Sequence, residues 1–351
     1  MHRRTFLKAS AAAAAGGLAA PAVGTLTSGA IAAPQLDRVL ARGMSLPWGI
    51  AFLPTGNALV TERASGDVYR VSSSGGKMLV GTVDEAVDYG EGGLLGPAVA
   101  PTFSTDNWVY FYVTTSDDNR IIRKQYDGSS LGPSQMVFSG IARTNNGSQN
   151  HHGGRLAFGP DAKLYATTGD AGNGQRAQDD NSPNGKILRI NPDGTVPADN
   201  PSPGNPMWSK GHRNVQGIAW DDSGQLWATE FGANDRDELN RIVKGHNYGW
   251  PVVEGGDGPG GPFHDPFVTW SPTSTCSPSG LAIVNGTAWV GALNGDCLWS
   301  VKLEGRNAGR KVRHFHNRFG RIRAVERVAG TDRLWITTSN GSRDKVIRIE
   351  V

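Results

Sequence analysis

The sequence repeats one unit six times, and this repeat limits the possible folds more than any other feature. Each unit has a short apolar strand, a turn containing Asp, Gly or Thr, and a second strand rich in Trp, Tyr, Val and Thr. The paired segments are 49–52 with 58–61, 96–99 with 108–113, 155–158 with 164–167, 217–220 with 226–229, 280–283 with 288–291, and 322–325 with 334–337. A stranded unit that recurs about every 50 residues is typical of the blades of a β-propeller.

Further apolar stretches follow most of these hairpins, for example 67–71, 186–190 and 345–349, and no part of the chain shows sustained helical periodicity. The 48 glycines among 351 residues argue against a helical bundle, and 10 tryptophans with a hydrophobic fraction of 38% exclude a disordered chain. We therefore predict an all-β fold, a six-bladed β-propeller of four-stranded antiparallel blades. Two separate β-sandwiches are the alternative.

Residues 1–32 have the pattern of an export signal. Arg3 and Arg4 are followed by Thr-Phe-Leu-Lys, an apolar run rich in Ala and Gly, and the small-residue sequence Ala30-Ile31-Ala32. This is the order of a twin-arginine-type signal peptide. The alternative is a membrane anchor, but the apolar run is short and contains too much Ala and Gly for a membrane-spanning helix. We predict that residues 33–351 form a single propeller domain that is exported to the periplasm or the extracellular space.

The net charge of +3 comes from 35 Lys and Arg against 32 Asp and Glu. Arg3, Arg4 and Lys8 all lie in the predicted signal peptide, which contains no acidic residue, so the mature chain is neutral. A neutral chain gives no reason to expect a nucleic-acid partner, and no later segment is long and apolar enough to predict stable membrane insertion.

Hairpin geometry predicts which polar residues meet. Residues equidistant from the turn of a hairpin lie at the same end of it. Three pairs satisfy this condition at the end opposite the tight turns, where the central channel of a propeller opens: His151 with Asp170, Arg213 with Gly232, and Arg321 with Asn340. We therefore expect a polar cluster at the mouth of the channel.

The residue types in this cluster favour a general base beside an anion site. A carboxylate such as Asp170 can orient the imidazole of His151 and hold its tautomer, which suits proton abstraction. Arg213, Arg321 and Arg323 can bind carboxylates through two hydrogen bonds each. The alternative is that these side chains only fill the channel with hydrogen bonds.

The stretch 234–238 (NDRDE) follows Gly232 and Ala233 and contains three acidic residues. Carboxylates mixed with backbone carbonyls suit Ca²⁺, which takes six to eight oxygen ligands. The alternative is an ordinary solvated, charged loop. Cys276 and Cys297, the two cysteines of the chain, lie almost symmetrically about the turn at 285–286, so they form either a disulfide or two inert thiols.

At these residues the sequence resembles the soluble pyrroloquinoline-quinone (PQQ)-dependent aldose or glucose sugar dehydrogenases, a family of six-bladed propellers. The matching stretches are 92–96 (GGLLG), 151–156 (HHGGRL), 169–170 (GD), 211–214 (GHRN), 237–240 (DELN), 247–251 (NYGWP) and 320–323 (GRIR). They span nearly the whole mature chain in the order of the family.

The resemblance implies an exported dehydrogenase that oxidises the anomeric hydroxyl of an aldose to a lactone. It implies that His151 takes the hydroxyl proton as a hydride passes to the quinone, and that Asp170 orients His151. Its implied cofactor contacts are Arg213 and Asn214 at the quinone oxygens, Arg213 also stabilising the reduced cofactor, and Arg321 and Arg323 at the quinone carboxylates. The substrate would be a small sugar, with an external electron acceptor and a monomeric or homodimeric enzyme.

The resemblance also implies Ca²⁺. The carbonyls of Gly232 and Ala233 match the ligands of a Ca²⁺ ion that polarises the quinone, and Glu238 with the Tyr248 carbonyl matches a second, structural calcium position.

Two cofactor-binding positions depart from the family. Glu91 stands where the family has Gln, and Asn294 stands where it has Lys. Because the quinone is a tricarboxylate, an added acid and a lost cation both weaken such a site. These departures leave two other functions open: a non-catalytic carbohydrate- or partner-binding propeller that has lost the quinone, and a Ca²⁺-dependent propeller lactonase.

Overall fold

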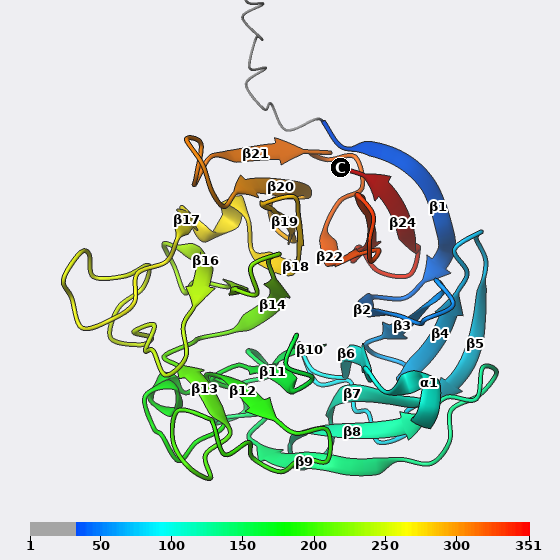
Figure 1. Cartoon of the computed structure of the whole chain (residues 1–351), viewed down its shortest axis with the longest axis horizontal. Helices are drawn as coiled ribbons and strands as arrows, with labels where there is room; N and C mark the ends of the chain where they lie inside the picture. Colours follow the sequence, from blue (N-terminus) through cyan, green and yellow to red (C-terminus); the bar gives the residue numbers. More distant parts are fainter. Residues whose placement is uncertain (1–32) are drawn as a thin grey trace, which may run out of the picture. The chain divides into compact units, whose positions relative to one another are not determined.

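The computed structural model describes residues 33–351, and the predicted signal peptide lies outside these residues. The described chain forms six four-stranded antiparallel sheets arranged in a ring (Figure 1). All twelve hairpin segments predicted from the repeats lie within strands, and so do the three further stretches. The predicted six-bladed β-propeller is therefore confirmed.

The blades follow one another along the chain. Blade 1 is β2 (Pro47–Phe52), β3 (Ala58–Glu62), β4 (Asp67–Val71) and β5 (Lys77–Thr82); blade 2 is β6 (Leu94–Val99), β7 (Trp108–Thr114), β8 (Asn119–Gln125) and β9 (Gln135–Ile141); blade 3 is β10 (Gly153–Phe158), β11 (Leu164–Thr168), β12 (Lys186–Ile190) and β13 (Met207–Lys210). Blade 4 is β14 (Val215–Trp220), β15 (Leu226–Glu230), β16 (Asp237–Ile242) and β17 (Val268–Trp270); blade 5 is β18 (Pro278–Val284), β19 (Thr287–Ala292), β20 (Cys297–Lys302) and β21 (Lys311–His314); blade 6 is β22 (Ile322–Arg327), β23 (Arg333–Thr338), β24 (Asp344–Glu350) and β1 (Gln35–Met44).

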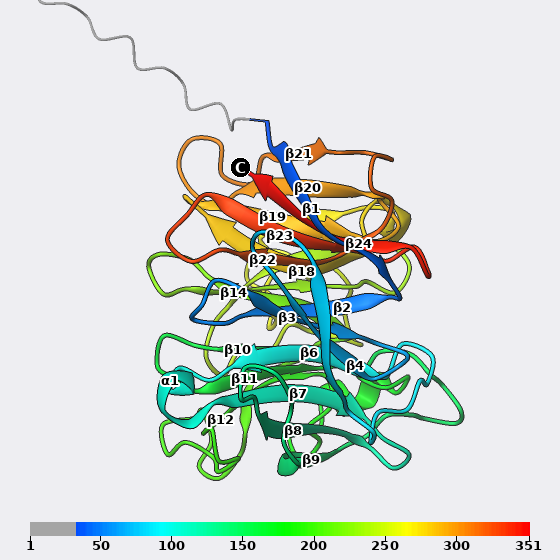
Figure 2. The same cartoon turned by 90° about the vertical axis from the view of Figure 1, so that its right-hand side faces the viewer.

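Blade 6 closes the ring with strands from both ends of the described chain. β1 pairs antiparallel with β24, from Gln35 opposite Glu350 to Met44 opposite Asp344, and Figure 2 shows the two strands side by side. A ring in which every blade contacts two neighbours buries both faces of each sheet, which explains why nearly every inner strand is buried along most of its length.

The first strand of each blade lines the channel and has an irregular register near its start. At three of these bulges a threonine of the second strand fills the gap: the hydroxyls of Thr61, Thr167 and Thr337 accept backbone N–H groups of the first strand at 3.1, 2.9 and 3.0 Å. Such bulges bend the strand and re-aim the residues beside it. The chain entering each first strand is thereby held at one end of the channel.

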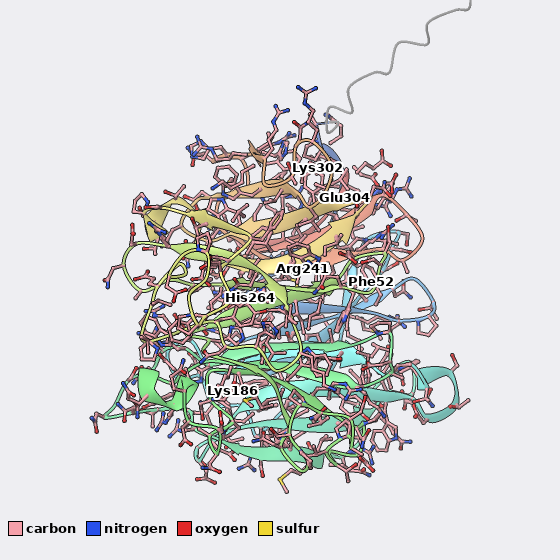
Figure 3. The ribbon with its side chains drawn as sticks, turned by 60° about the vertical axis from the view of Figure 1, so that its left-hand side comes forward. Phe52, Lys186, Arg241, His264, Lys302 and Glu304 are labelled. Atoms are coloured by element: carbon pink, nitrogen blue, oxygen red, sulfur yellow. The ribbon has the colours of Figure 1, made fainter. Side chains whose placement is uncertain are left out.

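Three short helical turns lie between the strands: α1 (Phe103–Asp106), η1 (Gly174–Ala177) and η2 (Thr273–Thr275). Lys186, labelled in Figure 3, holds the η1 loop in place. Its Nζ donates to the carbonyls of Arg176, Ala177 and Asn184 at 2.8, 3.1 and 2.9 Å. Burial lowers the pKa of Lys186 to about 8. No helix within residues 33–351 is long and apolar enough to cross a membrane.

The two cysteines are free thiols, which is the second of the two alternatives that the sequence left open. Cys276 and Cys297 are both free and both buried in the apolar cluster that blade 5 forms with Trp270 and Leu281. Burial raises the pKa of both thiols, that of Cys297 to about 12, so they carry the proton and behave as small apolar side chains. A disulfide, the other alternative, is therefore wrong.

Close packing between neighbouring first strands gives a test of this fold. A methyl group on Gly217 would overlap the Ser279 carbonyl of the next blade and the Thr229 hydroxyl, whereas one on Gly132 would make only ordinary contacts. We expect Gly217→Ala to lower the free energy of unfolding by about 1–3 kcal/mol, because backbone and a buried hydroxyl must shift. Gly132→Ala is the matched control, and equal denaturation midpoints for the two variants would contradict the packing.

Candidate active site

One end of the channel collects the polar residues predicted from the hairpins. Residues that precede a first strand and residues that follow a second strand share this end, because the two strands are antiparallel. The residues that precede first strands are Glu91, His151, Arg213, Asn214 and Arg321, and those that follow second strands are Asp170, Gly232, Asn294 and Asn340. Arg323 lies within β22 itself.

All three predicted pairs are in contact. His151 Nδ1 lies 2.7 Å from Asp170 Oδ1, Arg213 Nη1 donates to the Gly232 carbonyl at 2.7 Å, and the Arg321 backbone N–H donates to Asn340 Oδ1 at 3.0 Å. The spacing rule thus located the partners of three separate blades.

The carboxylate of Asp170 is held by three donors. Oδ1 accepts from His151 and from the Gly172 N–H at 2.8 Å, and Oδ2 accepts from the Trp250 indole N–H at 2.8 Å. The residue is only 2% exposed, and this burial acts to raise its pKa. The hydrogen bonds from His151, Gly172 and Trp250 outweigh burial and hold the pKa of Asp170 below its ordinary value. The side chain is therefore an ionised, fixed acceptor for the imidazole.

The backbone of His151 is fixed as firmly as its ring. The residue has a φ of 63°, in the left-handed region that non-glycine residues rarely adopt. Its N–H donates to Glu91 Oε2 at 2.9 Å, and the same oxygen lies 3.4 Å from Asn214 Nδ2. Glu91 precedes blade 2, and the two groups that donate to it precede blades 3 and 4, so its carboxylate connects three blades. One carboxylate oxygen can accept both hydrogen bonds.

An arginine-lined cavity of about 400 Å³ opens beside this network. Its walls include Trp48, Arg63, Arg321 and Arg323. Arg323 Nη1 donates to Gln216 Oε1 at 2.7 Å, and Arg321 Nη1 donates to Asn294 Oδ1 at 3.3 Å.

The pKa of Arg323 is lowered to about 9, chiefly by burial. Glu91 acts to raise this pKa, and the positive charges of Arg63, Arg321 and Arg155 act with burial to lower it. The cavity is therefore suited to a ligand with several negative charges.

The acidic loop of blade 4 is ordered around one carboxylate. Glu254 Oε1 accepts the backbone N–H groups of Ala233, Asn234, Asp235 and Arg236 at 2.7–3.0 Å. Burial acts to raise the pKa of Glu254, and these four donors lower it below its ordinary value. The loop that carries the Gly232 and Ala233 carbonyls thus has a fixed course.

Next to this loop, a small enclosed hollow is lined by the backbone at Gly232 and by Glu230, Glu238 and Tyr248. Burial and the neighbouring Glu230 raise the pKa of Glu238 to about 8, and burial raises that of Asp237 to about 7. In the part of the chain that the structure describes, no three acidic, histidine or cysteine side chains are arranged as a metal cage. The groups that line the hollow and could bind a metal are buried carboxylates, such as that of Glu238, and backbone carbonyls.

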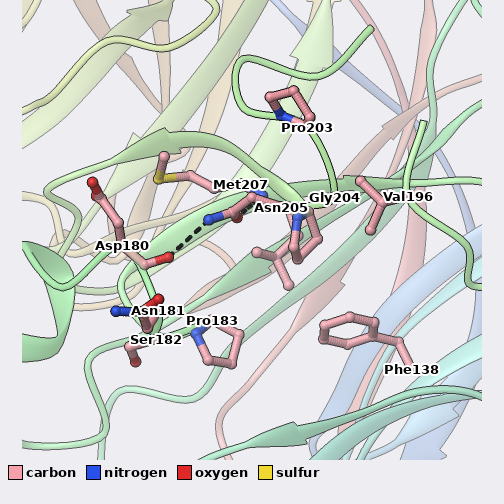
Figure 4. A pocket seen from close by; sticks show the side chains of 12 residues that line it. Phe138, Asp180, Asn181, Ser182, Pro183, Val196, Pro203, Gly204, Asn205 and Met207 are labelled. Atoms are coloured by element: carbon pink, nitrogen blue, oxygen red, sulfur yellow. Dashed lines mark hydrogen bonds between the residues drawn. The ribbon is translucent and has the colours of Figure 1, made fainter. Parts of the chain in front are cut away.

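A second hollow, of about 430 Å³, lies at the outer part of blades 2 and 3 (Figure 4). Its polar groups are engaged within the chain: Asn205 Nδ2 donates to the Asp180 carbonyl at 2.8 Å, and the Asp180 carboxylate pairs with Lys210 at 2.7 Å. It lacks the concentration of arginines seen at the channel mouth.

Trp250, Arg63 and Glu254 were not predicted from the sequence. Trp250 and Glu254 lie outside the inner hairpins, so the spacing rule does not reach them, and the signal for Trp250 was its place in the stretch 247–251. Arg63 directly follows β3, so the same rule places it at this end of the channel, opposite the apolar Leu46.

Comparison with known proteins identifies the family. Residues 44–348 match the family model described as Glucose / Sorbosone dehydrogenase. The chain belongs to this family. The resemblance found in the sequence is therefore confirmed.

Other members are similar over much of the ring. The structure of the PQQ-bound form of aldose sugar dehydrogenase from Streptomyces coelicolor is 44% identical, with a TM-score of 0.85 over 90% of this chain and 97% of that chain. Quinoprotein glucose dehydrogenase B of Acinetobacter calcoaceticus is 34% identical over 62% of this chain and 52% of its own, so this chain spans about half of that relative. The aldose sugar dehydrogenase of Escherichia coli is 31% identical over 66% of each chain.

The ionised state of Asp170 has a measurable consequence. Because its pKa is lower in the folded chain than the value near 4 of an unfolded chain, its contribution to stability is complete above about pH 4 and is lost as the pH falls through the folded-state pKa. We expect Asp170→Asn to lower the free energy of unfolding by about 1–3 kcal/mol at pH 7, and by less at pH 3. Asp117→Asn, at an exposed aspartate, is the control; a pH-independent loss in Asp170→Asn would contradict the assignment.

Proposed function

We propose that this protein is a PQQ-dependent aldose dehydrogenase that oxidises the anomeric hydroxyl of a sugar to the lactone. Family membership supports an oxidoreductase acting on sugars. The observation that carries the finer proposal is the position of the His151–Asp170 pair at the same channel mouth as a cavity lined by Arg321 and Arg323.

The residues present suit a quinone with three carboxylates. The cavity of about 400 Å³ lies within the range of small-molecule sites, and guanidinium groups bind carboxylates in a planar, two-bond geometry. Arg321 and Arg323 are the residues that would hold carboxylates, and Arg213 and Asn214 are those that would face the quinone oxygens. The quinone, when bound, supplies the acceptor for the hydride that leaves the anomeric carbon.

His151 is the proposed general base. With Asp170 ionised, Nδ1 of His151 carries the proton of their 2.7 Å hydrogen bond, which leaves Nε2 free to accept the hydroxyl proton of the sugar. The positive charge that then forms on the imidazole is stabilised by the buried Asp170 carboxylate. Trp250 holds the second oxygen of that carboxylate and so fixes the direction of the base.

Arg213 is the proposed electrostatic stabiliser. Its guanidinium lies 5.5 Å from the centre of the Trp250 ring and donates to the Gly232 carbonyl, so it is held between the base and the blade 4 loop. A fixed positive charge there stabilises negative charge that develops on the cofactor oxygens.

We propose Ca²⁺ as the second cofactor, with the Gly232 and Ala233 carbonyls as its protein ligands. Carbonyl oxygens held on a fixed loop suit Ca²⁺, and the remaining ligands would come from the quinone and from water. For the structural calcium implied at Glu238 and the Tyr248 carbonyl, support comes from the burial of Glu238, because a carboxylate with a raised pKa gains most from a neighbouring cation.

We also propose that the enzyme is exported by the twin-arginine route. The support is the order of residues 1–32, with Arg3 and Arg4 followed by a weakly apolar run and Ala30-Ile31-Ala32. Assays should therefore use the chain that begins near residue 33.

The role of His151 is tested by His151→Ala in the mature protein, with PQQ, Ca²⁺, a redox dye and a panel of aldoses. We expect kcat to fall about 10²–10⁴-fold, because the base is lost, while PQQ binding is retained. His316→Ala is the control, since His316 is an exposed histidine. Turnover unchanged in His151→Ala would remove it from the mechanism, and loss of PQQ binding together with turnover would make it structural.

If the wild-type protein binds no PQQ at micromolar concentration, the dehydrogenase proposal fails. The non-catalytic binding propeller then becomes the better reading, and the Glu91 and Asn294 departures favour it. Hydrolysis of lactones that depends on Ca²⁺ but not on PQQ would instead identify a lactonase.

Metal removal tests the Ca²⁺ proposal. We expect a chelator to weaken PQQ binding by at least about tenfold and addition of Ca²⁺ to restore it, because the carbonyl ligands cannot otherwise connect the loop to the quinone. Mg²⁺ should restore less, since it demands a smaller octahedral site. Equal PQQ affinity with and without chelator, measured by equilibrium dialysis, would exclude a metal bridge.

A further inference from the structure

Arg63 lies on the wall of the arginine-lined cavity and is not among the site residues predicted from the sequence. It directly follows β3 in blade 1 and lines the cavity with Arg321 and Arg323 of blade 6. Its side chain is 18% exposed. Its backbone N–H donates to the Leu46 carbonyl, and its carbonyl accepts the Leu94 N–H at 2.9 Å.

The guanidinium of Arg63 is only partly satisfied. Nη1 donates to the Gly90 carbonyl at 2.6 Å, and Nη2 lies 3.6 Å from the half-exposed Asp88 carboxylate. Nε is buried and has no hydrogen-bond partner anywhere in residues 33–351. With one carbonyl acceptor and one distant, half-exposed carboxylate, the guanidinium keeps donors and charge available to an anion in the cavity that it lines.

The charge balance of the cavity points the same way. Arg321, on the same wall, donates to the neutral Asn294 amide oxygen rather than to a carboxylate. Arg63 itself holds the Gly90 carbonyl, next to Glu91. Of the described residues, those that line the cavity therefore include three arginines and no acidic side chain.

We propose that Arg63 is a further cofactor-binding residue, which supplies a positive charge to a carboxylate of the quinone. This inference rests on the proposed function, because it assumes that the cavity takes the quinone. It assigns the anion site to blades 1 and 6 together.

The test measures the dissociation constant of PQQ for the mature protein by equilibrium dialysis in the presence of Ca²⁺. We expect Arg63→Gln to weaken binding about ten- to a hundredfold, the effect of losing one hydrogen bond between charged groups. Arg63→Lys keeps the charge and should stay within about fivefold of wild type. Arg333→Gln, at an exposed arginine of β23 that pairs with Glu350, is the matched control and should not change the constant.

Each outcome decides the inference. If wild type binds PQQ and Arg63→Gln binds it with the same dissociation constant, the inference is overturned. It is also overturned if the Gln and Lys variants weaken binding equally, because that would mean a structural role for Arg63. No binding by wild type overturns the proposed function as well, so the two failures are distinguishable.

If Arg63→Gln does not fold, the wild-type protein decides. A guanidine-directed dicarbonyl reagent, read by peptide mass spectrometry, should label Arg63 less when PQQ is present, while Arg333 is labelled equally. Equal labelling of Arg63 with and without PQQ overturns the inference.

Discussion

Antiparallel pairing of the first two strands of each blade is the constraint on which the site depends. It places the residue that enters the first strand beside the residue that leaves the second, at one end of the channel, in every blade. The bulge near the start of each first strand, filled in blades 1, 3 and 6 by a buried threonine hydroxyl, fixes the direction of the entering residue. The left-handed backbone of His151 is a local cost of this arrangement, and the antiparallel pairing and the Glu91 hydrogen bond stabilise it.

The same constraint explains how much could be predicted from the sequence. Twelve inner strands follow from short, nearly continuous apolar stretches on either side of a turn, because both faces of an inner hairpin are buried. Once the strands are placed, the contacts of His151 with Asp170 and of Arg213 with Gly232 follow by counting residues from the turn. Family membership, inferred from short motifs in a fixed order, agrees with the match over residues 44–348.

Two residues that the sequence did not predict lie on a segment without this regularity. Trp250 and Glu254 belong to the long connection between β16 and β17, and a loop of that length can return to the ring at many points. Its course depends on contacts that only the folded chain makes: the indole bond to Asp170 and the four N–H groups around Glu254. The cysteines show a limit of the spacing rule itself. Symmetry about a turn brings two residues near each other but does not decide whether they form a disulfide.

Charge separation at the channel mouth connects these observations to chemistry. Arginines from blades 1 and 6 lie on one side, and buried carboxylates of blade 4 lie on the other. Burial and mutual repulsion both lower the pKa of Arg323, so in the absence of a ligand the cluster is electrostatically unfavourable, and Glu91 offsets only part of it. Because bringing like charges together in a buried site opposes folding, such a cluster is best explained by an anion that binds the folded chain and stabilises it. The carboxylate of Glu91 is turned toward the His151 N–H and Asn214, where it holds the proposed base in place.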